Sequence, residues 1–347
     1  MKNVAARSRP WIGLAIVVTV ITASGFVVDR LRGSQQDLLI TVMLHAYWAM
    51  AWNILGGLAG QLSFGHAAFI GAGAYTSSIL YVHFGVNPWI GMFGGALVAA
   101  ALGLFVGYLS FRYGLRDVYF SLTTLAFGEI AYLLLANTDY HSVFGGQGGV
   151  RFPVVDPSPA IFQFSRKVGY YYVIAVLLAI AVGLTWWIRR SKLGYYLIAI
   201  RENERAAQAI GIPITRYKLI ATVISAFLAA LGGTFYAQYY LFIDPPSIVQ
   251  GSLSIAVLLP AIVGGMDTLL GPLVGSIVLI PIAEQIRTSL SGGIAGGHLV
   301  VYGLVIILVM LFVPQGIVGW LVERGWFSRR RRAPAPEAPS PRATASV

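Results

Sequence analysis

The chain has 347 residues, of which 57% are hydrophobic and only 11% are charged. Average proteins are about 45 to 50% apolar and about 25% charged, so these values exclude an ordinary soluble globular protein. The formal net charge is +11, which in a membrane protein indicates topology rather than nucleic-acid binding. We therefore predict a polytopic membrane protein that contacts lipid and does not bind nucleic acid.

Ten apolar segments follow one another along the chain. The first, residues 11–28, has no small-residue cleavage site before Asp29, so we expect a retained span and not a signal peptide. The other segments are residues 38–58, 64–83, 88–110, 118–136, 169–188, 218–242, 252–265, 269–286 and 298–313. The predicted fold is an all-α bundle of nine or ten transmembrane or re-entrant segments.

The eighth segment, residues 252–265, differs from the others because it is short and contains Pro260. We expect it to be re-entrant or broken, and it is open whether it and the ninth segment cross the bilayer completely.

The basic residues predict the orientation of the bundle. With a cytoplasmic N-terminus and ten crossings, 18 of the 24 Lys and Arg residues fall on the cytoplasmic side. Cytoplasmic loops carry an excess of Lys and Arg, so both termini are predicted to be cytoplasmic.

Two connections are longer than usual. The outer one, residues 137–168, contains Gly-Gly-Gln-Gly-Gly at 145–149 and Asp-Pro-Ser-Pro at 156–159, which are consistent with a structured extracytoplasmic cap that could touch a partner; a solvated connector is an equal alternative. The inner one, residues 189–217, contains a stretch at 199–210 that predicts one short amphipathic helix ended by Gly211, with Ile198, Ala206 and Ile210 on one face.

The C-terminal tail has a different composition. Residues 329–332 are four arginines, and an Ala- and Pro-rich stretch follows to residue 347. We expect residues 1–328 to form the membrane domain, and residues 329–347 to be a disordered cytoplasmic tail that meets anionic lipid.

Several enzymatic chemistries lack their residue patterns. No lysine follows the glycine spacing of a nucleotide-binding loop, the five histidines have no metal-ligand spacing, and no Gly-x-Ser-x-Gly elbow occurs. The sequence contains no cysteine, which excludes disulfides, thiol catalysis and iron–sulfur clusters. We expect no catalytic residue, no metal site and no cofactor.

A glycine-rich stretch at residues 56–75 interrupts the apolar pattern with Gln61 and Ser63. Two interpretations are open. The stretch is either a broken helix that lines a pathway, or a tightly packed helix pair whose polar groups satisfy one another. A second glycine cluster at 264–275 hints at two similar halves.

Few ionisable residues lie within the spans. Glu284 and Arg287 are three apart on a helix and predict a mutual ion pair. Asp267 lies at a segment end. Glu129 has no obvious local partner, so it either bonds its neighbours or faces a hydrated cavity.

Three strings carry a resemblance to a known family: Gly-Gln-Leu-Ser-Phe-Gly-His at 60–66, Tyr-Phe-Ser-Leu-Thr-Thr-Leu-Ala-Phe-Gly-Glu-Ile at 119–130, and the glycine string at 145–149. They resemble branched-chain amino-acid ABC transporter permeases of the LivM type, over about residues 38–319. The first string is also shared with permeases for urea and short amides.

The resemblance implies an importer of the bacterial inner membrane. It implies a sister permease subunit as a heterodimer partner, two cytoplasmic ABC ATPases, and a periplasmic or lipid-anchored substrate-binding protein. Permeases of such importers carry an E-A-A-x-x-x-G coupling motif, and Ala206, Ala207 and Gly211 fit its spacing. Arg205 stands at the acidic position, with Glu204 one residue earlier.

The resemblance also implies which residues act. Residues Arg201, Glu204, Arg205, Ala206, Ala207, Ile210 and Gly211 would dock on the ATPase. The resemblance suggests leucine, isoleucine or valine as the solute. From their positions in the spans, and not from the resemblance, the residues expected along the translocation path are Gln61, Ser63, Gly65, His66, Thr123 and Glu129. We expect Gln61, Ser63 and Thr123 to be polar contacts, because they lie in glycine-rich, otherwise apolar spans. A urea or short-amide permease, and an ATP-independent proton-coupled carrier that uses Glu129, remain as alternatives.

Overall fold

The computed structural model describes residues 28–139, 142–153, 156–266, 268–289, 303, 311 and 316–323. The expected first span at 11–28, the tenth at 298–313, Asp267 and the tail at 329–347 therefore lie outside the described residues, apart from Val28, Gly303 and Leu311. The boundary at residue 328 stays a prediction.

Long helices dominate the described part of the chain. They are α2 (Gly33–Asn53), α3 (His66–Phe84), α4 (Pro88–Arg112), α5 (Asp117–Ala136), α6 (Lys167–Arg190), α9 (Ile214–Tyr240), α11 (Gly251–Gly264) and α12 (Gly271–Ser289). Each of the eight overlaps one of the predicted segments. The helical fold expected from the sequence is thus confirmed across the described residues.

Shorter elements join these helices. They are the π-helical turn η1 (Ile54–Leu58), the 3₁₀ turns η2 (Gly146–Gly148) and η3 (Pro159–Ile161), the helices α7 (Lys192–Glu202), α8 (Glu204–Ala209), α10 (Pro245–Ile248) and α14 (Gly316–Glu323), and the strands β1 (Val150–Arg151) and β2 (Phe242–Ile243).

Six helical segments in the described residues are long and apolar enough to cross a membrane. They contain α2 with η1, α4, α5, α6, α9, and α10 together with α11. The helices α3 and α12 are long enough but not apolar enough to be included. Helix α3 contains the polar residues His66, Ser77 and Ser78, and α12 ends in a charged turn. The eighth predicted segment is α11, which runs through Pro260 to Gly264, so the expectation of a break within it is wrong; together with α10 it is long enough to span.

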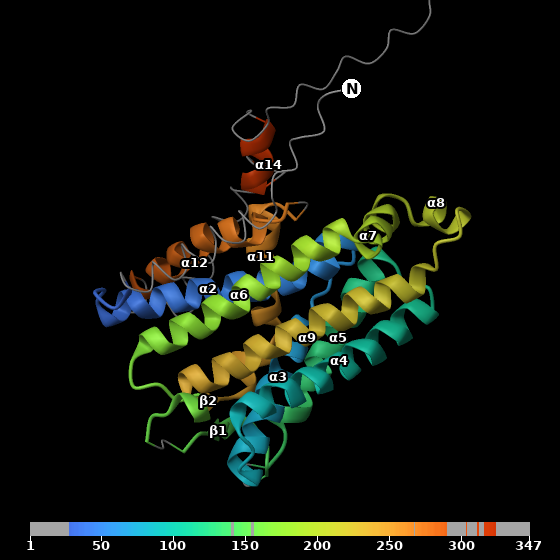
Figure 1. Cartoon of the computed structure of the whole chain (residues 1–347). Coiled ribbons are helices and arrows are strands. Elements are labelled where there is room, and N and C mark those ends of the chain that lie inside the picture. Colours follow the sequence, from blue (N-terminus) through green and yellow to red (C-terminus); the bar gives the residue numbers. More distant parts are fainter. Residues whose placement is uncertain are drawn as a thin grey trace, which may run out of the picture.

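The helix α9 runs through the middle of the bundle, between α6 and α4 (Figure 1). It packs most extensively against α4 and α3, and it also contacts α2, which in turn packs against α6, α11 and α12. Figure 1 shows α7 and α8 at one end of the bundle and the β1–β2 pair at the opposite end.

The helix α2 forms the core of the bundle. Tyr47, Trp48 and Trp52 are among the largest fully buried side chains. The Tyr47 hydroxyl donates to the Leu228 carbonyl at 2.7 Å, and the Trp48 indole donates to the Ala229 carbonyl at 3.2 Å. Polar atoms within lipid need such partners, so these two bonds fix α2 against α9.

The long outer loop is folded, as predicted for a cap. Strand β1 pairs antiparallel with β2, with Val150 opposite Ile243. Phe162 is fully buried and stacks on Trp89 with ring centroids 4.1 Å apart, while the Trp89 indole donates to the Pro159 carbonyl. The loop is therefore anchored both to α4 and to the segment that follows α9.

The second glycine cluster builds a tight hairpin of α11 and α12. A Cβ atom on Gly264 would lie 1.7 Å from the Gly271 carbonyl oxygen, and one on Gly275 would lie 1.9 Å from that of Pro260. Only glycine permits backbones to approach this closely. Near the end of α12, Arg287 contacts Glu284 at 2.6 Å, which confirms the predicted ion pair.

Candidate functional site

The glycine-rich stretch contains a break between two helices. Helix α2 continues through the π-helical turn η1 to Leu58, and α3 begins at His66. Gly60 lies in the break with φ of 68°, a left-handed conformation that favours glycine. A Cβ atom on Gly60 would lie 2.7 Å from Cγ of Arg201. A helix break is therefore present, and it touches the inner loop; whether it lines a pathway stays a prediction.

A buried chain of hydrogen bonds holds this break. The Ser225 hydroxyl donates to the Ala51 carbonyl at 2.7 Å, so its oxygen accepts from Nε2 of His66 at 2.8 Å. The other nitrogen of a neutral ring, Nδ1, then accepts from the Ser63 hydroxyl at 3.1 Å. Ser63 and His66 are both fully buried, and their polar side-chain atoms bond within the chain.

The backbone of the break is also satisfied by neighbouring helices. Ser121 of α5 donates to the Leu62 carbonyl at 2.8 Å, and Thr124 accepts from the Phe64 N–H at 3.1 Å. Further bonds run from the Trp52 indole to the Ser63 carbonyl and from the Ala67 N–H to Ser254. The residues that sequence reasoning missed here are Ser121, Thr124, Ser225 and Ser254. Thr124 stood next to the chosen Thr123, but no local signal separates the two.

Gly65 and Gln61 occupy opposite sides of this network. A Cβ atom on Gly65 would lie 2.4 Å from the Thr124 carbonyl oxygen, so the glycine permits a close approach of α5. The Gln61 amide nitrogen donates to the Ala59 carbonyl, whereas its buried Oε1 has no hydrogen-bond partner in the described residues. Gln61 lines a pocket of about 490 Å³ together with Arg201 and Arg205.

Thr123 and Glu129 lie apart from the break, on the more open side of α5. Both side chains are partly exposed, and the Thr123 hydroxyl donates to the Tyr119 carbonyl of its own helix at 2.8 Å. The Glu129 carboxylate lies near the start of α11, since a Cβ atom added to Gly251 would lie 3.2 Å from it. Gln61, Ser63 and Thr123 therefore do not form one cluster of polar contacts.

The inner loop contains two helices, which corrects the prediction of one. Helix α7 ends at Glu202, and Asn203 then caps α8 by accepting from the Ala206 N–H at 3.0 Å. An asparagine side chain competes well for a helix N-terminus, which explains the break. The C-terminal cap is as predicted, since Gly211 has φ of 87° and the Ile212 N–H donates to the Ala207 carbonyl.

The predicted apolar face of this segment is wrong. Ala207 is buried with Ile200 and Ile212 in a small cluster, whereas Ile210 is 76% exposed and Ala206 is also exposed. The break at Asn203 changes the rotation of α8 relative to α7, so a helical pattern drawn across it mixes two faces. Ala206 and Ile210 consequently point away from the bundle.

Glu204 faces the bundle. Its carboxylate contacts Arg116 at 3.3 Å and forms an ion pair with Lys218, whose side chain is only 2% exposed. The Lys218 ammonium also lies 5.3 Å from the centroid of the Phe111 ring. These partners are distant in sequence, so the spacing of the coupling motif could not reveal them.

Arg201 links the inner loop to the break. One guanidinium nitrogen donates to the Gly57 carbonyl at 2.8 Å, and another contacts Glu202 at 2.7 Å. The neighbouring Arg205 is exposed and lines the pocket beside Gln61. The predicted coupling residues thus divide into two groups. Arg201, Glu204 and Ala207 contact the bundle, while Arg205, Ala206 and Ile210 are exposed.

Comparisons with known proteins give the family. Residues 35–313 match the model of the branched-chain amino acid transport system permease component. The chain is 28% identical to the LivM high-affinity branched-chain amino acid permease of Salmonella typhimurium, over 88% of this chain and 74% of that protein.

Two more distant relatives are also transport proteins. The chain is 26% identical to the probable branched-chain amino acid permease LivH of Methanocaldococcus jannaschii, over 74% of this chain and 82% of the relative. It is 25% identical to the fructose import permease FruF of Bifidobacterium longum, over 72% and 77%. Because the family model covers most of the chain, this protein belongs to the branched-chain amino acid transport system permease family.

Proposed function

We propose that this chain is the LivM-type permease subunit of an ATP-driven importer for leucine, isoleucine and valine in the bacterial inner membrane. It would pair with a sister permease, two cytoplasmic ATPases and a substrate-binding protein. The proposed substrates are those named for the LivM relative, which is 28% identical to this chain, and not the fructose named for the relative that is 25% identical. The coupling role rests on the two faces of α8. One face is bonded to the bundle by the ion pair of Glu204 with Lys218, and the other exposes Ala206 and Ile210.

The exposed face of α8 suits a protein partner. Ile210 is a large apolar side chain in a loop outside the spans, where an apolar anchor gains most by entering a partner's groove. Arg205, five residues earlier and also exposed, would supply a positive charge where the coupling motif has an acid. We infer that the ATPase surface opposite Arg205 is more negatively charged than a surface that receives an acidic residue at this position.

The contacts of α8 with the bundle would carry its movement inward. Glu204 connects α8 to the start of α9 through Lys218, and Arg201 connects α7 to the carbonyl of Gly57 beside the break. A displacement of α8 by the closing ATPases would therefore reach both α9 and the break, and would bias the bundle between two access states.

The translocation residues divide by their surroundings. Ser63, Gly65 and His66 lie in packed, bonded surroundings, so we assign them to positioning the break. Gln61, with its free carbonyl oxygen, and Thr123 and Glu129 on the open side of α5 are our candidates for contact with the solute or its water.

Uptake by the complete importer in proteoliposomes tests this proposal. Ile210→Asp should lower ATP-driven leucine uptake about tenfold, since a charge at an apolar anchor costs at least about 1.4 kcal/mol of binding. Ile90→Asp, which charges an isoleucine of α4 that is 66% exposed, should have little effect.

Other outcomes identify the alternatives. Uptake that persists when the ATPases are inactivated would indicate a carrier, and Glu129→Gln would then decide whether protons drive it. ATP-driven uptake of urea without uptake of leucine would assign the chain to the urea and amide permeases.

A further inference from the structure

An apolar groove runs along α9 between α4 and α6. It consists of two pockets of about 870 and about 790 Å³, and both are lined by Val223 and Ile224. The two pockets meet at these residues, and we call them together the α4–α9–α6 groove. Its α6 wall belongs to the 790 Å³ pocket. The candidate coupling and translocation residues do not line it.

The middle of the groove is made of hydrocarbon. Phe93 and Leu97 of α4 and Val176 and Ile180 of α6 form its walls, and each is more than half exposed. Phe227 of α9 lies between them. No charged residue belongs to the described lining of the 790 Å³ pocket. Such a surface is suited to acyl chains or to another apolar helix.

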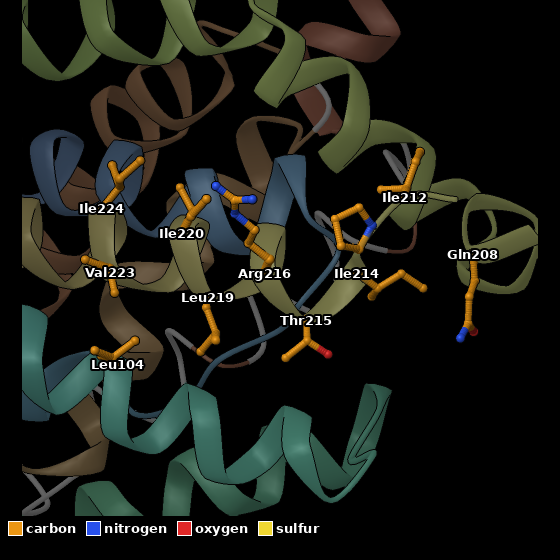
Figure 2. A pocket seen from close by; sticks show the side chains of 11 residues that line it. Leu104, Gln208, Ile212, Ile214, Thr215, Arg216, Leu219, Ile220, Val223 and Ile224 are labelled. Atoms are coloured by element: carbon orange, nitrogen blue, oxygen red, sulfur yellow. The ribbon is translucent and has the colours of Figure 1, made fainter. Parts of the chain in front are cut away.

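The two ends of the groove differ in chemistry. Near one end Gln208, Thr215 and Arg216 line the 870 Å³ pocket (Figure 2). Figure 2 also shows Leu104 of α4 opposite α9 in this pocket. At the other end, Trp89 and Tyr172 line the 790 Å³ pocket. Trp and Tyr are favoured at the boundary between hydrocarbon and water, so the groove extends over the depth of the membrane.

The polar end is strongly basic. All three helices of the groove carry arginine there: Arg112 in the last turn of α4, Arg189 and Arg190 in the last turn of α6, and Arg216 in the first turn of α9. No carboxylate lines the 870 Å³ pocket in the described residues, and Arg216 forms no ion pair among them. The excess of basic residues assigns this end to the cytoplasmic leaflet, whose lipids are anionic.

We propose that the α4–α9–α6 groove binds an anionic phospholipid of the cytoplasmic leaflet. The acyl chains lie along Val223, Ile224 and the hydrocarbon walls. The phosphate lies at Arg216, at the end of the groove that Thr215 and Gln208 also line.

Charge and polarity favour a lipid over a protein helix in this groove. A protein helix in this groove would need a carboxylate at the Arg216 end and apolar residues along the rest. Every anionic phospholipid already has a negative phosphate at one end and apolar acyl chains at the other. The face that offers polar groups at membrane depth is α5, with Thr123 and Glu129. Since Gln208 belongs to α8, the 870 Å³ pocket also borders the proposed coupling segment.

Lipid analysis of the complete importer, purified from its own membrane and washed in detergent, tests the site. Arg216→Ala should lower the ratio of retained anionic to zwitterionic phospholipid about fivefold, since one basic side chain near an anionic surface contributes about that factor. Arg216→Lys should restore most of the ratio. Arg205→Ala removes an exposed arginine that does not line the groove and should leave the ratio unchanged.

The groove itself is tested separately from the charge. Val223→Trp fills the section shared by the two pockets and should release both classes of lipid. Equal lipid retention in wild type, Arg216→Ala and Val223→Trp would overturn the proposal.

A second measurement does not depend on the tolerance of Val223. The natural chain has no cysteine, so Ile180→Cys can carry a single photoreactive group within the groove. Crosslinks to phospholipid support the proposal. Crosslinks predominantly to the sister permease, or to residues 11–27 of the same chain, would overturn it by identifying a protein occupant.

Discussion

Helices α2 and α5 have nearly equal mean hydropathy and very different surroundings. In the segment that contains α2, 78% of the most apolar window is buried inside the protein, but the corresponding value for α5 is 22%. Lipid tails are as apolar as leucine, so hydropathy indicates that a helix spans without indicating what it faces. The difference must come from other residues.

Polar atoms on aromatic side chains distinguish the two helices. In α2, the indoles of Trp48 and Trp52 donate to carbonyls of other segments. In α5, large apolar side chains such as Leu122 and Leu134 are more than half exposed. Tyr119 of α5 also carries a hydroxyl but is 70% exposed, so the interior position of α2 is marked by its two indoles and not by every aromatic donor.

The largest expected effect comes from removing a core aromatic. Trp48→Ala should destabilise the protein by about 3 kcal/mol, near the lower end for such cavities because the unfolded helix still lies in lipid. Leu134→Ala on the open face of α5 should have an effect near zero. Thermal unfolding in detergent measures both. Equal losses would mean that α5 is buried against a partner that stays bound in detergent.

The same substitution in the two helical segments sharpens the comparison. An alanine Cβ at Gly57 would lie 2.6 Å from the Met266 carbonyl oxygen, whereas one at Gly128 would come no closer than 3.6 Å to its nearest neighbour. Gly57→Ala should therefore cost about 1 to 3 kcal/mol, and Gly128→Ala should be neutral or slightly stabilising. A comparable loss for Gly128→Ala in the assembled importer alone would reveal a partner helix at that position.

The smallest expected effect distinguishes residues that position the break from residues that contact the solute. Ser63→Ala removes the hydroxyl that bonds His66 and should lower stability by about 1 kcal/mol. Thr123→Ala should leave stability unchanged and raise the KM for leucine. Thermal unfolding and uptake kinetics on the same preparations distinguish the roles. A stable Ser63→Ala variant with a raised KM would return Ser63 to the solute path.

Local pattern predicted most of the architecture. The limits of the long helices follow from apolar length, and the break at residues 59–65 follows from the glycines and polar residues that interrupt it. The helix end at Gly211 was predictable because helices commonly end at a residue in the left-handed conformation, which is usually glycine. The Glu284–Arg287 pair was predictable because its members lie three apart on one helix.

Long-range partners could not be predicted. The β1–β2 pair joins two-residue strands that are about 90 residues apart, too short to leave a pattern. The partners of Glu204, namely Arg116 and Lys218, come from two other elements. The buried face of α8 was not predicted because Asn203 ends α7 and begins a new helix. A single capping side chain therefore outweighed the weak amphipathic pattern at residues 199–210.

Helix α9 has 27 residues without interruption, so it is about 40 Å long. Its first turns hold Lys218, the partner of Glu204, and strand β2 follows its last turn and pairs with the outer loop. One stiff rod therefore has the coupling segment at one end and the outer cap at the other. Under the coupling role proposed above for α8, a tilt imposed at the first turns of α9 would also displace its last turn, so α9 would act as a lever arm between the two ends of the bundle.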